Sequence, residues 1–283
     1  MTSYIKNEIE LFEEELKKII SSSNNFLNED IYNFIFSSAK RLRVRFIFLF
    51  AKILKINDNK VFDIALATEL FHSASLVHDD IIDCDKLRRK IPTFNYKYNS
   101  KIAVLVGDML LSLALKSLAN TNNTILKIFS NRIFKTLEGE IEQNNSNNSI
   151  PTFENYINKT FNKTGNLFLS GVESLFELDK TNIEQKENIL NFLKNYSIAF
   201  QINNDIKNFK IDNSDFKNGN YTLPMIYLKL ENGSIDDIEK YSSLAYQKVV
   251  EYKNIALSFL NKLEKSKYID EIIDLTEKSL GKI

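Results

Sequence analysis

Residues 72–83 have the sequence HSASLVHDDIID, in which Asp79, Asp80 and Asp83 end a largely apolar stretch. Asp79 and Asp83 are four residues apart, so a helix places their carboxylates on one face, with Asp80 beside them. Like charges at this spacing destabilise a helix unless a cation lies between them. Mg²⁺ prefers such hard oxygen ligands and often binds one or two carboxylates together with substrate phosphates. We therefore expect a metal site here rather than a frayed acidic helix end, because the helical pattern continues back to His72.

Basic residues lie on both sides of this acidic cluster in the sequence. Downstream, Arg88 and Arg89 are adjacent. They could form surface salt bridges, which stabilise proteins little, but the planar guanidinium is also well matched to diphosphate oxygens. Upstream, a run of basic residues precedes an apolar stretch and consists of Lys40, Arg41, Arg43 and Arg45. Positive charge at the start of a helix opposes the helix dipole, which favours an anion-binding role for these residues.

The composition favours a helical protein. The chain has 283 residues, 43% of them hydrophobic, with only 7 Gly and 3 Pro. Apolar residues recur at three- and four-residue spacing, interrupted by short Asn-rich turns, and we expect a single all-α domain over residues 1–283. The predicted helices cover residues 3–20, 28–36, 40–55, 60–83, 101–118, 122–143, 152–174, 183–210, 222–230, 235–262 and 266–281.

Charge and composition also exclude several classes of protein. The 37 basic and 37 acidic residues give no net charge, which argues against nucleic-acid binding. A single Cys excludes an intramolecular disulfide framework and is compatible with a reducing cytosol. The longest nearly apolar stretch, 102–115, is shorter than the roughly 20 residues that a membrane span needs. The N-terminus lacks the pattern of a signal peptide. We therefore expect a cytoplasmic protein without stable membrane insertion.

Several short motifs, in order along the chain, resemble those of the trans-isoprenyl (polyprenyl) diphosphate synthases, and most closely the long-chain branch. The segment from Glu69 to Asp83, followed by Arg88-Arg89 and by VLVGD at 104–108, is similar to the first aspartate-rich region of that family. Further similarities are KRLR at 40–43 to the GGKRLRP box, EGE at 138–140 to the GE segment, KTG at 163–165 to the KTA box, FQI at 200–202 to the FQI box, and 215–224 to the DLxxGKxTLP tail.

The resemblance implies an all-α bundle of about ten or more helices, of the isoprenoid synthase type, around a central apolar cavity. It implies a homodimeric prenyltransferase that condenses isopentenyl diphosphate with an allylic diphosphate. In that reaction Mg²⁺, two or three ions per site, assists ionisation of the allylic diphosphate, and the carbocation is attacked by isopentenyl diphosphate. Charge neutralisation on the leaving group is the main physical requirement.

The resemblance also implies roles for individual residues. Asp79, Asp80 and Asp83 would hold Mg²⁺ on the allylic diphosphate, which Arg88 and Lys163 would also bind. The hydroxyl of Thr164 and the amide of Gln201 would present oxygen dipoles to the developing cation. The isopentenyl diphosphate site would consist of Lys40, Arg43, His72 and Arg89.

The chain departs from the family pattern at its second aspartate-rich motif, DDxxD. Residues 204–208 read NDIKN, so Asp205 is the carboxylate that remains, and Lys207 lies inside the motif. Asp205 and Asn204 are the candidate ligands for a third metal ion, although neutral amide oxygens bind Mg²⁺ more weakly than carboxylates. Asn220 replaces the tail Lys, and Ser38 and Ala39 replace two glycines.

Two other functions remain open. Asn204, Asn208 and Asp212 are spaced like the NSE metal triad of class I terpene cyclases, with Asn for Ser and Asp for Glu. A drifted motif that binds no metal is the alternative, and it would suit a regulatory subunit of a heteromeric synthase. A cyclase, however, has no use for an isopentenyl diphosphate site, and a purely structural subunit has no need of the first acidic cluster.

Small and large side chains before the acidic cluster bear on product length. In the family that the chain resembles, bulk on this helix one to two turns before the acidic cluster sets the floor of the product tunnel. The resemblance therefore implies that Ala74 and Ser75 leave the tunnel open, that Phe71 could close it one turn deeper, and that the product is C20 or longer. His78 and Cys84 are interpreted as structural residues.

Overall fold

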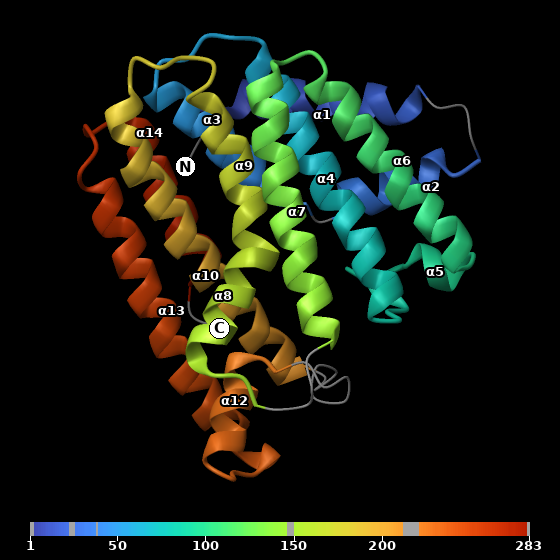
Figure 1. Cartoon of the computed structure of the whole chain (residues 1–283), viewed down its shortest axis with the longest axis vertical. Helices are drawn as coiled ribbons and strands as arrows, with labels where there is room; N and C mark the ends of the chain where they lie inside the picture. The colour runs from blue at the N-terminus through green and yellow to red at the C-terminus, as the bar shows by residue number, and fades with distance from the viewer. Residues whose placement is uncertain (1–2, 23–25, 38, 146–149, 212–220, 282–283) are drawn as a thin grey trace. The chain divides into compact units, whose positions relative to one another are not determined.

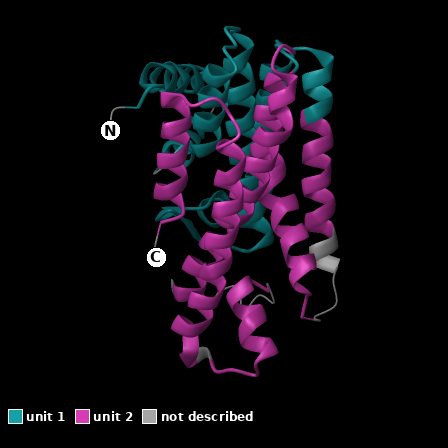
Figure 2. Ribbon diagram, turned by 90° about the vertical axis from the view of Figure 1, so that its left-hand side faces the viewer, with its two compact units in different colours: residues 1–128, 177–179 teal, residues 129–176, 180–283 magenta. Residues whose placement is uncertain are grey.

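The computed structural model describes residues 3–22, 26–37, 39–145, 150–211 and 221–281. These residues are predominantly helical, which confirms the all-α fold class (Figure 1). The chain forms two compact units (Figure 2). Unit 1 comprises residues 1–128 and 177–179, and unit 2 comprises residues 129–176 and 180–283. Ser38, Asp212, residues 215–219 and Asn220, which the sequence analysis singled out, lie outside the described residues.

Unit 1 is built around α4, which packs along α6 and against α3. Aromatic rings fill its core: the ring centroids of Phe48 lie 6.4 Å from Phe12 and 5.0 Å from Phe62. Asn99 caps α6 by accepting a hydrogen bond from the Ile102 amide (3.0 Å). The elements of this unit are α1 (Lys6–Ser21), α2 (Asn28–Phe36), α3 (Leu42–Ile53), α4 (Lys60–Ile82), β1 (Leu87–Arg88), β2 (Ile91–Pro92), α5 (Phe94–Lys97), α6 (Ser100–Leu118) and the first part of α7 (Asn123–Asn145).

Unit 2 is built around α10, which packs along α13 and also contacts α9 and α12. Tyr196 lies at the centre of its core, stacked on Phe192 and Phe200, with its hydroxyl 2.9 Å from Ser279 Oγ. Besides the rest of α7, the unit contains α8 (Phe153–Thr160), the π-helix η1 (Phe161–Gly165), α9 (Asn166–Leu175), η2 (Ile183–Gln185), α10 (Lys186–Ile211), α12 (Leu223–Leu230), η3 (Ile235–Asp237), α13 (Ile238–Leu260) and α14 (Lys267–Ser279).

The observed elements differ from the predicted helices at several places, including the 3-10 turns η2 and η3 at the starts of the helices predicted over 183–210 and 235–262. The predicted helix over 152–174 is divided into α8, the π-helix η1 and α9. The helix expected to begin at residue 40 begins at Leu42, because Arg41 has a left-handed backbone with φ of 51°. The hairpin β1–β2 and the short helix α5 were not expected. Within the described part of the chain, no helix combines the length and the apolar character needed to cross a membrane.

Two glycines mark close approaches between helices. A Cβ atom on Gly165 would lie 2.4 Å from the Phe161 ring and 2.8 Å from Ser197 Oγ of α10. A Cβ atom on Gly107 of α6 would lie 2.1 Å from His78 Nε2 of α4. The two sites differ in how easily an added methyl group is accommodated. At Gly107 the His78 side chain is 32% exposed and can move outward, whereas at Gly165 the methyl group would meet Phe161 and Ser197.

We expect Gly165→Ala to lower the free energy of unfolding by about 1–3 kcal/mol, because the added methyl group is confined from two sides. Gly107→Ala is the matched control and should cost less, since only the His78 imidazole has to move. Urea denaturation of both variants measures the difference. An equal or larger loss in Gly107→Ala would contradict this reading of the packing.

Candidate active site

The acidic cluster lies at the C-terminal end of α4. The Asp83 amide donates a hydrogen bond to the Asp79 carbonyl (2.8 Å), so these two residues are one turn apart on the same face. Both are partly exposed, whereas Asp80 is only 1% exposed. The negative end of the helix dipole adds to the negative charge here, which favours a bound cation.

Asp80 has surroundings unlike those of its two neighbours. Its Oδ1 accepts a hydrogen bond from Arg88 Nε at 2.6 Å, while its Oδ2 is buried without a hydrogen-bond partner among the described residues. Burial raises the pKa of Asp80 to about 6, against the lowering effect of Arg88. Asp80 was predicted to be a metal ligand together with Asp79 and Asp83, and one of its oxygens is hydrogen bonded to Arg88.

The residues of this cluster fit a magnesium ion. They supply carboxylate oxygens, one of which, on Asp80, is buried and lacks a hydrogen bond. In the part of the chain that the structure describes, no three His, Cys, Asp or Glu side chains gather closely enough to hold a metal alone. This arrangement suits Mg²⁺, which commonly keeps waters and takes its other ligands from a substrate phosphate.

The hairpin after α4 positions the two adjacent arginines. Leu87 pairs with Pro92 and Arg88 with Ile91, leaving a two-residue turn. Its residues Arg89 and Lys90 have φ values of 50° and 69°, as in the turns that suit two-residue hairpins. Arg88 is thereby directed to Asp80, and Arg89 Nη1 donates to the Ser37 carbonyl at 3.0 Å.

His72 lies among the arginines of unit 1. Burial, followed by the positive charges of Arg43, Arg89, Arg88 and Arg41, holds the pKa of His72 well below its usual value. The imidazole is therefore neutral near physiological pH and can donate one hydrogen bond. Lys40 is exposed just before this group, in the segment between α2 and α3. All four residues predicted for isopentenyl diphosphate thus lie in unit 1.

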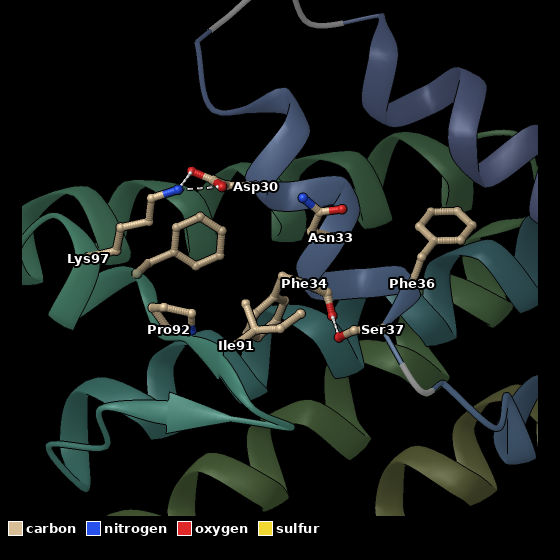
Figure 3. A pocket seen from close by; sticks show the side chains of 9 residues that line it. Asp30, Asn33, Phe34, Phe36, Ser37, Ile91, Pro92 and Lys97 are labelled. Atoms are coloured by element: carbon tan, nitrogen blue, oxygen red, sulfur yellow. Dashed lines mark hydrogen bonds and ion pairs between the residues drawn. The ribbon is translucent and has the colours of Figure 1, made fainter.

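A separate cavity of about 430 Å³ lies beside this region, between α2 and the segment from β2 to α5 (Figure 3). Its walls are mainly Phe34, Phe36, Ile91, Pro92 and Phe94. At one end Lys97 Nζ donates to both oxygens of Asp30 at 2.7 Å. None of the site residues predicted from the sequence lines this cavity.

In unit 2 the π-helix η1 carries two predicted site residues. Thr164 Oγ1 donates to Gln201 Oε1 of α10 at 2.7 Å, and Lys163 Nζ lies 3.4 Å from Glu140 Oε1 of α7. π-Helical turns occur mostly as single turns within α-helices and are frequent at functional sites. Gly165 lets this turn approach α10 closely, because a larger residue would meet Phe161 and Ser197.

A chain of hydrogen bonds continues from the partly exposed Gln201 to the buried residues Asp205 and Tyr156. Gln201 Nε2 donates to Asp205 Oδ1 at 2.8 Å, and the Tyr156 hydroxyl donates to Asp205 Oδ2 at 2.6 Å. Burial raises the pKa of Asp205, while these two hydrogen bonds lower it. Each carboxylate oxygen of Asp205 therefore already accepts a hydrogen bond from the protein.

The second motif consequently fits a third metal ion poorly. Asp205 is 7% exposed and hydrogen bonded at both oxygens. Asn204 is partly exposed and Asn208 is exposed, but both offer only neutral amide oxygens. Asp212, the third member of the cyclase-like triad, lies outside the described residues.

Three residues that support these groups were not predicted from the sequence. Tyr156 holds Asp205, while Glu13 and Glu69 pair with Arg41. Glu13 and Glu69 each lie 28 residues from Arg41, and Tyr156 lies 49 residues from Asp205, so no local pattern connects these partners.

Comparison with known proteins identifies relatives over most of the chain. A family model described as polyprenyl synthetase matches residues 25–259. A prenyl transferase of Cyanophora paradoxa is 31% identical over 244 residues, which cover 82% of this chain and 76% of the relative. Component 2 of the heptaprenyl diphosphate synthase of Geobacillus stearothermophilus is 30% identical over 238 residues, or 80% of this chain and 74% of the relative.

Solved structures of polyprenyl synthases superimpose on nearly the whole chain. Heptaprenyl diphosphate synthase from Staphylococcus aureus superimposes with a TM-score of 0.91 at 25% identity, covering 100% of this chain and 99% of its own. A polyprenyl synthase from Caulobacter crescentus CB15, complexed with calcium and isoprenyl diphosphate, gives a TM-score of 0.87 at 19% identity and covers 98% and 96%. The second structure shares the fold.

We expect Tyr156→Phe to lower the free energy of unfolding by about 1–3 kcal/mol, because it leaves a buried carboxylate oxygen without its donor. Tyr241→Phe is the matched control, since that buried tyrosine reaches Glu231 Oε2 at a longer 3.4 Å. Its loss should stay near 0.5 kcal/mol, roughly the low end for a hydrogen bond. Equal losses in urea denaturation would show that the Tyr156–Asp205 bond has no special weight.

Proposed function

The chain belongs to the polyprenyl synthetase family and is a prenyltransferase, and we propose that it condenses isopentenyl diphosphate with an allylic diphosphate to make an all-trans polyprenyl diphosphate of C20 or longer. The observation that carries this proposal is the presence, in unit 1, of an acidic helix end and a cluster of arginines around a neutral histidine. The first suits a metal-bound diphosphate, and the second suits a diphosphate bound directly by cationic groups.

The reaction breaks the bond between the allylic carbon and its diphosphate oxygen, and the diphosphate leaves with the electron pair. The double bond of isopentenyl diphosphate attacks the resulting cation and forms the new carbon–carbon bond. A proton is then lost to the departing diphosphate. Because negative charge develops on the leaving group and positive charge on carbon, the protein needs cations near the first and oxygen dipoles near the second.

Isopentenyl diphosphate is assigned to the arginine cluster of unit 1. Arg43 and Arg89 supply guanidinium groups that can bind phosphate oxygens in a bidentate manner. His72 supplies a neutral N–H donor, since burial and the surrounding arginines lower its pKa. Lys40, which is exposed before α3, supplies a further ammonium group. A group of this composition neutralises a diphosphate without needing a metal ion.

The allylic diphosphate is assigned to the acidic end of α4. Asp79 and Asp83 would hold Mg²⁺, with Asp80 contributing Oδ2, and Arg88 would bind the diphosphate from its position beside Asp80. When bound, Mg²⁺ neutralises charge on the leaving diphosphate. The Caulobacter crescentus synthase is complexed with both calcium and isoprenyl diphosphate, which supports a divalent cation together with a diphosphate as ligands of this chain.

The unit 2 residues are assigned to the carbocation and its leaving group. Lys163 supplies a cation for the diphosphate. The Thr164 hydroxyl donates its hydrogen to Gln201, which leaves the Thr164 oxygen lone pairs available to face positive charge. Asp205 fixes the amide of Gln201 from the other side. We assign no metal ion to Asn204 and Asp205. The proposed reaction therefore depends on the Mg²⁺ ions that the acidic end of α4 would hold.

Two other functions, a terpene cyclase and a partner-dependent subunit, have less support. A terpene cyclase would require a metal triad at Asn204, Asn208 and Asp212, and it would have no use for the arginine cluster. A partner-dependent subunit is favoured by one observation: a relative named as component 2 of a heptaprenyl diphosphate synthase. The assay below separates these functions.

We further propose that the protein is a cytoplasmic homodimer. Helix α7 presents an apolar stripe in which Phe134, Leu137 and Ile141 are each more than half exposed. Leu126 lies on the same stripe, since positions 126, 134, 137 and 141 follow the helical repeat. Contiguous exposed apolar surface of this kind marks protein interfaces, and a second copy would cover it with the same stripe.

The first test of the function is incubation with Mg²⁺, isopentenyl diphosphate and farnesyl diphosphate. We expect elongated polyprenyl diphosphate, and we expect Asp79→Asn to reduce the rate by at least about 100-fold, because it removes a charged metal ligand. Asp63→Asn, in the first turn of the same helix, should retain activity. Retained activity in Asp79→Asn would exclude the metal assignment. Cyclic hydrocarbon would indicate the cyclase, and activity that appears only with a second protein would indicate the subunit.

Product length tests the placement of Phe71. This side chain is 6% exposed and lies two turns before Asp79, and Ala74 between them is fully buried. If Phe71 closes the product tunnel, Phe71→Ala should shift the product distribution to longer chains by one or more isoprene units. Phe62→Ala, which removes a ring from the same helix, is the control and should leave the distribution unchanged. Chromatography of the dephosphorylated products gives the answer, and an unchanged profile in Phe71→Ala would refute this placement.

A further inference from the structure

Arg41 forms ion pairs with two helices of unit 1 and lies immediately before a third. Its Nε and Nη2 donate to the two carboxylate oxygens of Glu13 on α1, at 2.7 and 3.1 Å. Its Nη1 donates to Glu69 Oε1 on α4 at 2.6 Å and to the Ile35 carbonyl of α2 at 3.0 Å. The side chain is only 3% exposed. One guanidinium thus joins α1, α2 and α4 at the start of α3.

Aromatic rings and the backbone hold this guanidinium further. Its carbon lies 5.0 Å from the centroid of Phe36 and 5.9 Å from that of Phe12. The backbone of Arg41 has a φ of 51°, in the left-handed region, and its carbonyl accepts the first hydrogen bond of α3 from the Arg45 amide (2.8 Å). A non-glycine residue adopts this conformation only when its surroundings stabilise it.

The position of Arg41 connects it to the proposed isopentenyl diphosphate site. Lys40 precedes it and Arg43 follows it, and Glu69 lies one turn before His72 on α4. Glu69 is 5% exposed, so its carboxylate is a buried negative charge close to groups that must bind an anion. The same carboxylate acts on Arg89, because burial lowers the pKa of Arg89 and Glu69 opposes that effect.

We propose that Arg41 is a positioning residue for isopentenyl diphosphate: it neutralises Glu69 so that Arg89 remains available to the diphosphate, and it fixes the backbone between Lys40 and Arg43. This inference rests on the proposed function. Arg41 itself is turned into the protein and does not contact substrate. Without it, Glu69 would be a buried charge without its ion-pair partner, and its attraction for Arg89 would compete with the diphosphate.

An arginine is required for this role. The planar guanidinium can bind Glu13 with two parallel hydrogen bonds and still reach Glu69 and a carbonyl, whereas lysine offers one ammonium group. A buried ion pair contributes little net stability, but removing one partner leaves an uncompensated charge. Loss of Arg41 is therefore expected to weaken diphosphate binding through the uncompensated charge of Glu69, in addition to any effect on the stability of the fold.

The test is a comparison of Michaelis constants. With the wild-type enzyme as reference, Arg41→Gln should raise the KM for isopentenyl diphosphate about tenfold, while the KM for the allylic diphosphate changes by less than about twofold. The double variant Arg41→Gln/Glu69→Gln removes both charges, and its KM for isopentenyl diphosphate should return to within about threefold of the wild-type value. A structural role alone would not separate the two substrates or be reversed by neutralising Glu69.

Arg132→Gln is the matched control, because Arg132 also pairs with a carboxylate, Glu173 Oε2, at 2.8 and 3.1 Å, but lies in unit 2. It should lower the melting temperature without changing the ratio of the two Michaelis constants. If Arg41→Gln does not fold, Arg41→Lys replaces it, with an expected rise of about threefold in KM for isopentenyl diphosphate alone.

Three outcomes would overturn the inference: an unchanged KM for isopentenyl diphosphate in the folded Arg41 variant, a parallel rise for both substrates, or no recovery in the double variant. If the wild-type enzyme elongates no allylic diphosphate, the proposed function itself fails. Elongation by the wild type together with any of the three outcomes leaves the function intact and removes only the role of Arg41.

Discussion

Repulsion between like charges is the constraint on which the functional part of unit 1 depends. Three aspartates share the negative end of α4, and four arginines surround His72. The protein neutralises each group only in part, through the Arg88–Asp80 pair and the pairing of Arg41 with Glu13 and Glu69. The charge that remains is positive in one place and negative in the other. In the proposed function one diphosphate neutralises the arginine cluster and the Mg²⁺ of a second diphosphate neutralises the aspartates, so a chain with no net charge can be unevenly charged locally.

Regular helices could be predicted from the sequence, because periodicity and caps determine them. Helix α4 ends within one residue of its predicted limit, and Asn99 marks the start of α6. The hairpin escaped prediction because its strands have two residues each, too few to show alternation. The π-turn at Phe161–Gly165 escaped because a single wider turn leaves the apolar pattern of a helix almost unchanged. Residue types at the site were predictable, whereas their partners were not, since Arg41 and Tyr156 pair with residues far along the chain.

The second motif shows how the loss of charges changes the role of the residue that remains. Asn stands at 204 and 208, so Asp205 has no carboxylate neighbours in the motif and does not need a cation to balance them. Its oxygens instead accept hydrogen bonds from Tyr156 and Gln201. A buried polar network that is fully hydrogen bonded is rigid, and this one ends at the Thr164 hydroxyl. The carboxylate has thus become part of the support for the dipoles assigned to the carbocation.

The turn of the hairpin has a consequence for the thermodynamics of binding. Arg89 and Lys90 both have positive φ values, which glycine would adopt without the steric cost that a side chain imposes. That cost is met when the chain folds, and it restricts the backbone from which the Arg89 side chain extends. A glycine turn would stay flexible in the folded protein and would lose its backbone freedom only when an anion binds. That loss of conformational entropy would lower the affinity for the anion. The backbone of the turn is therefore restricted once, when the chain folds, and does not have to be restricted again each time a substrate binds.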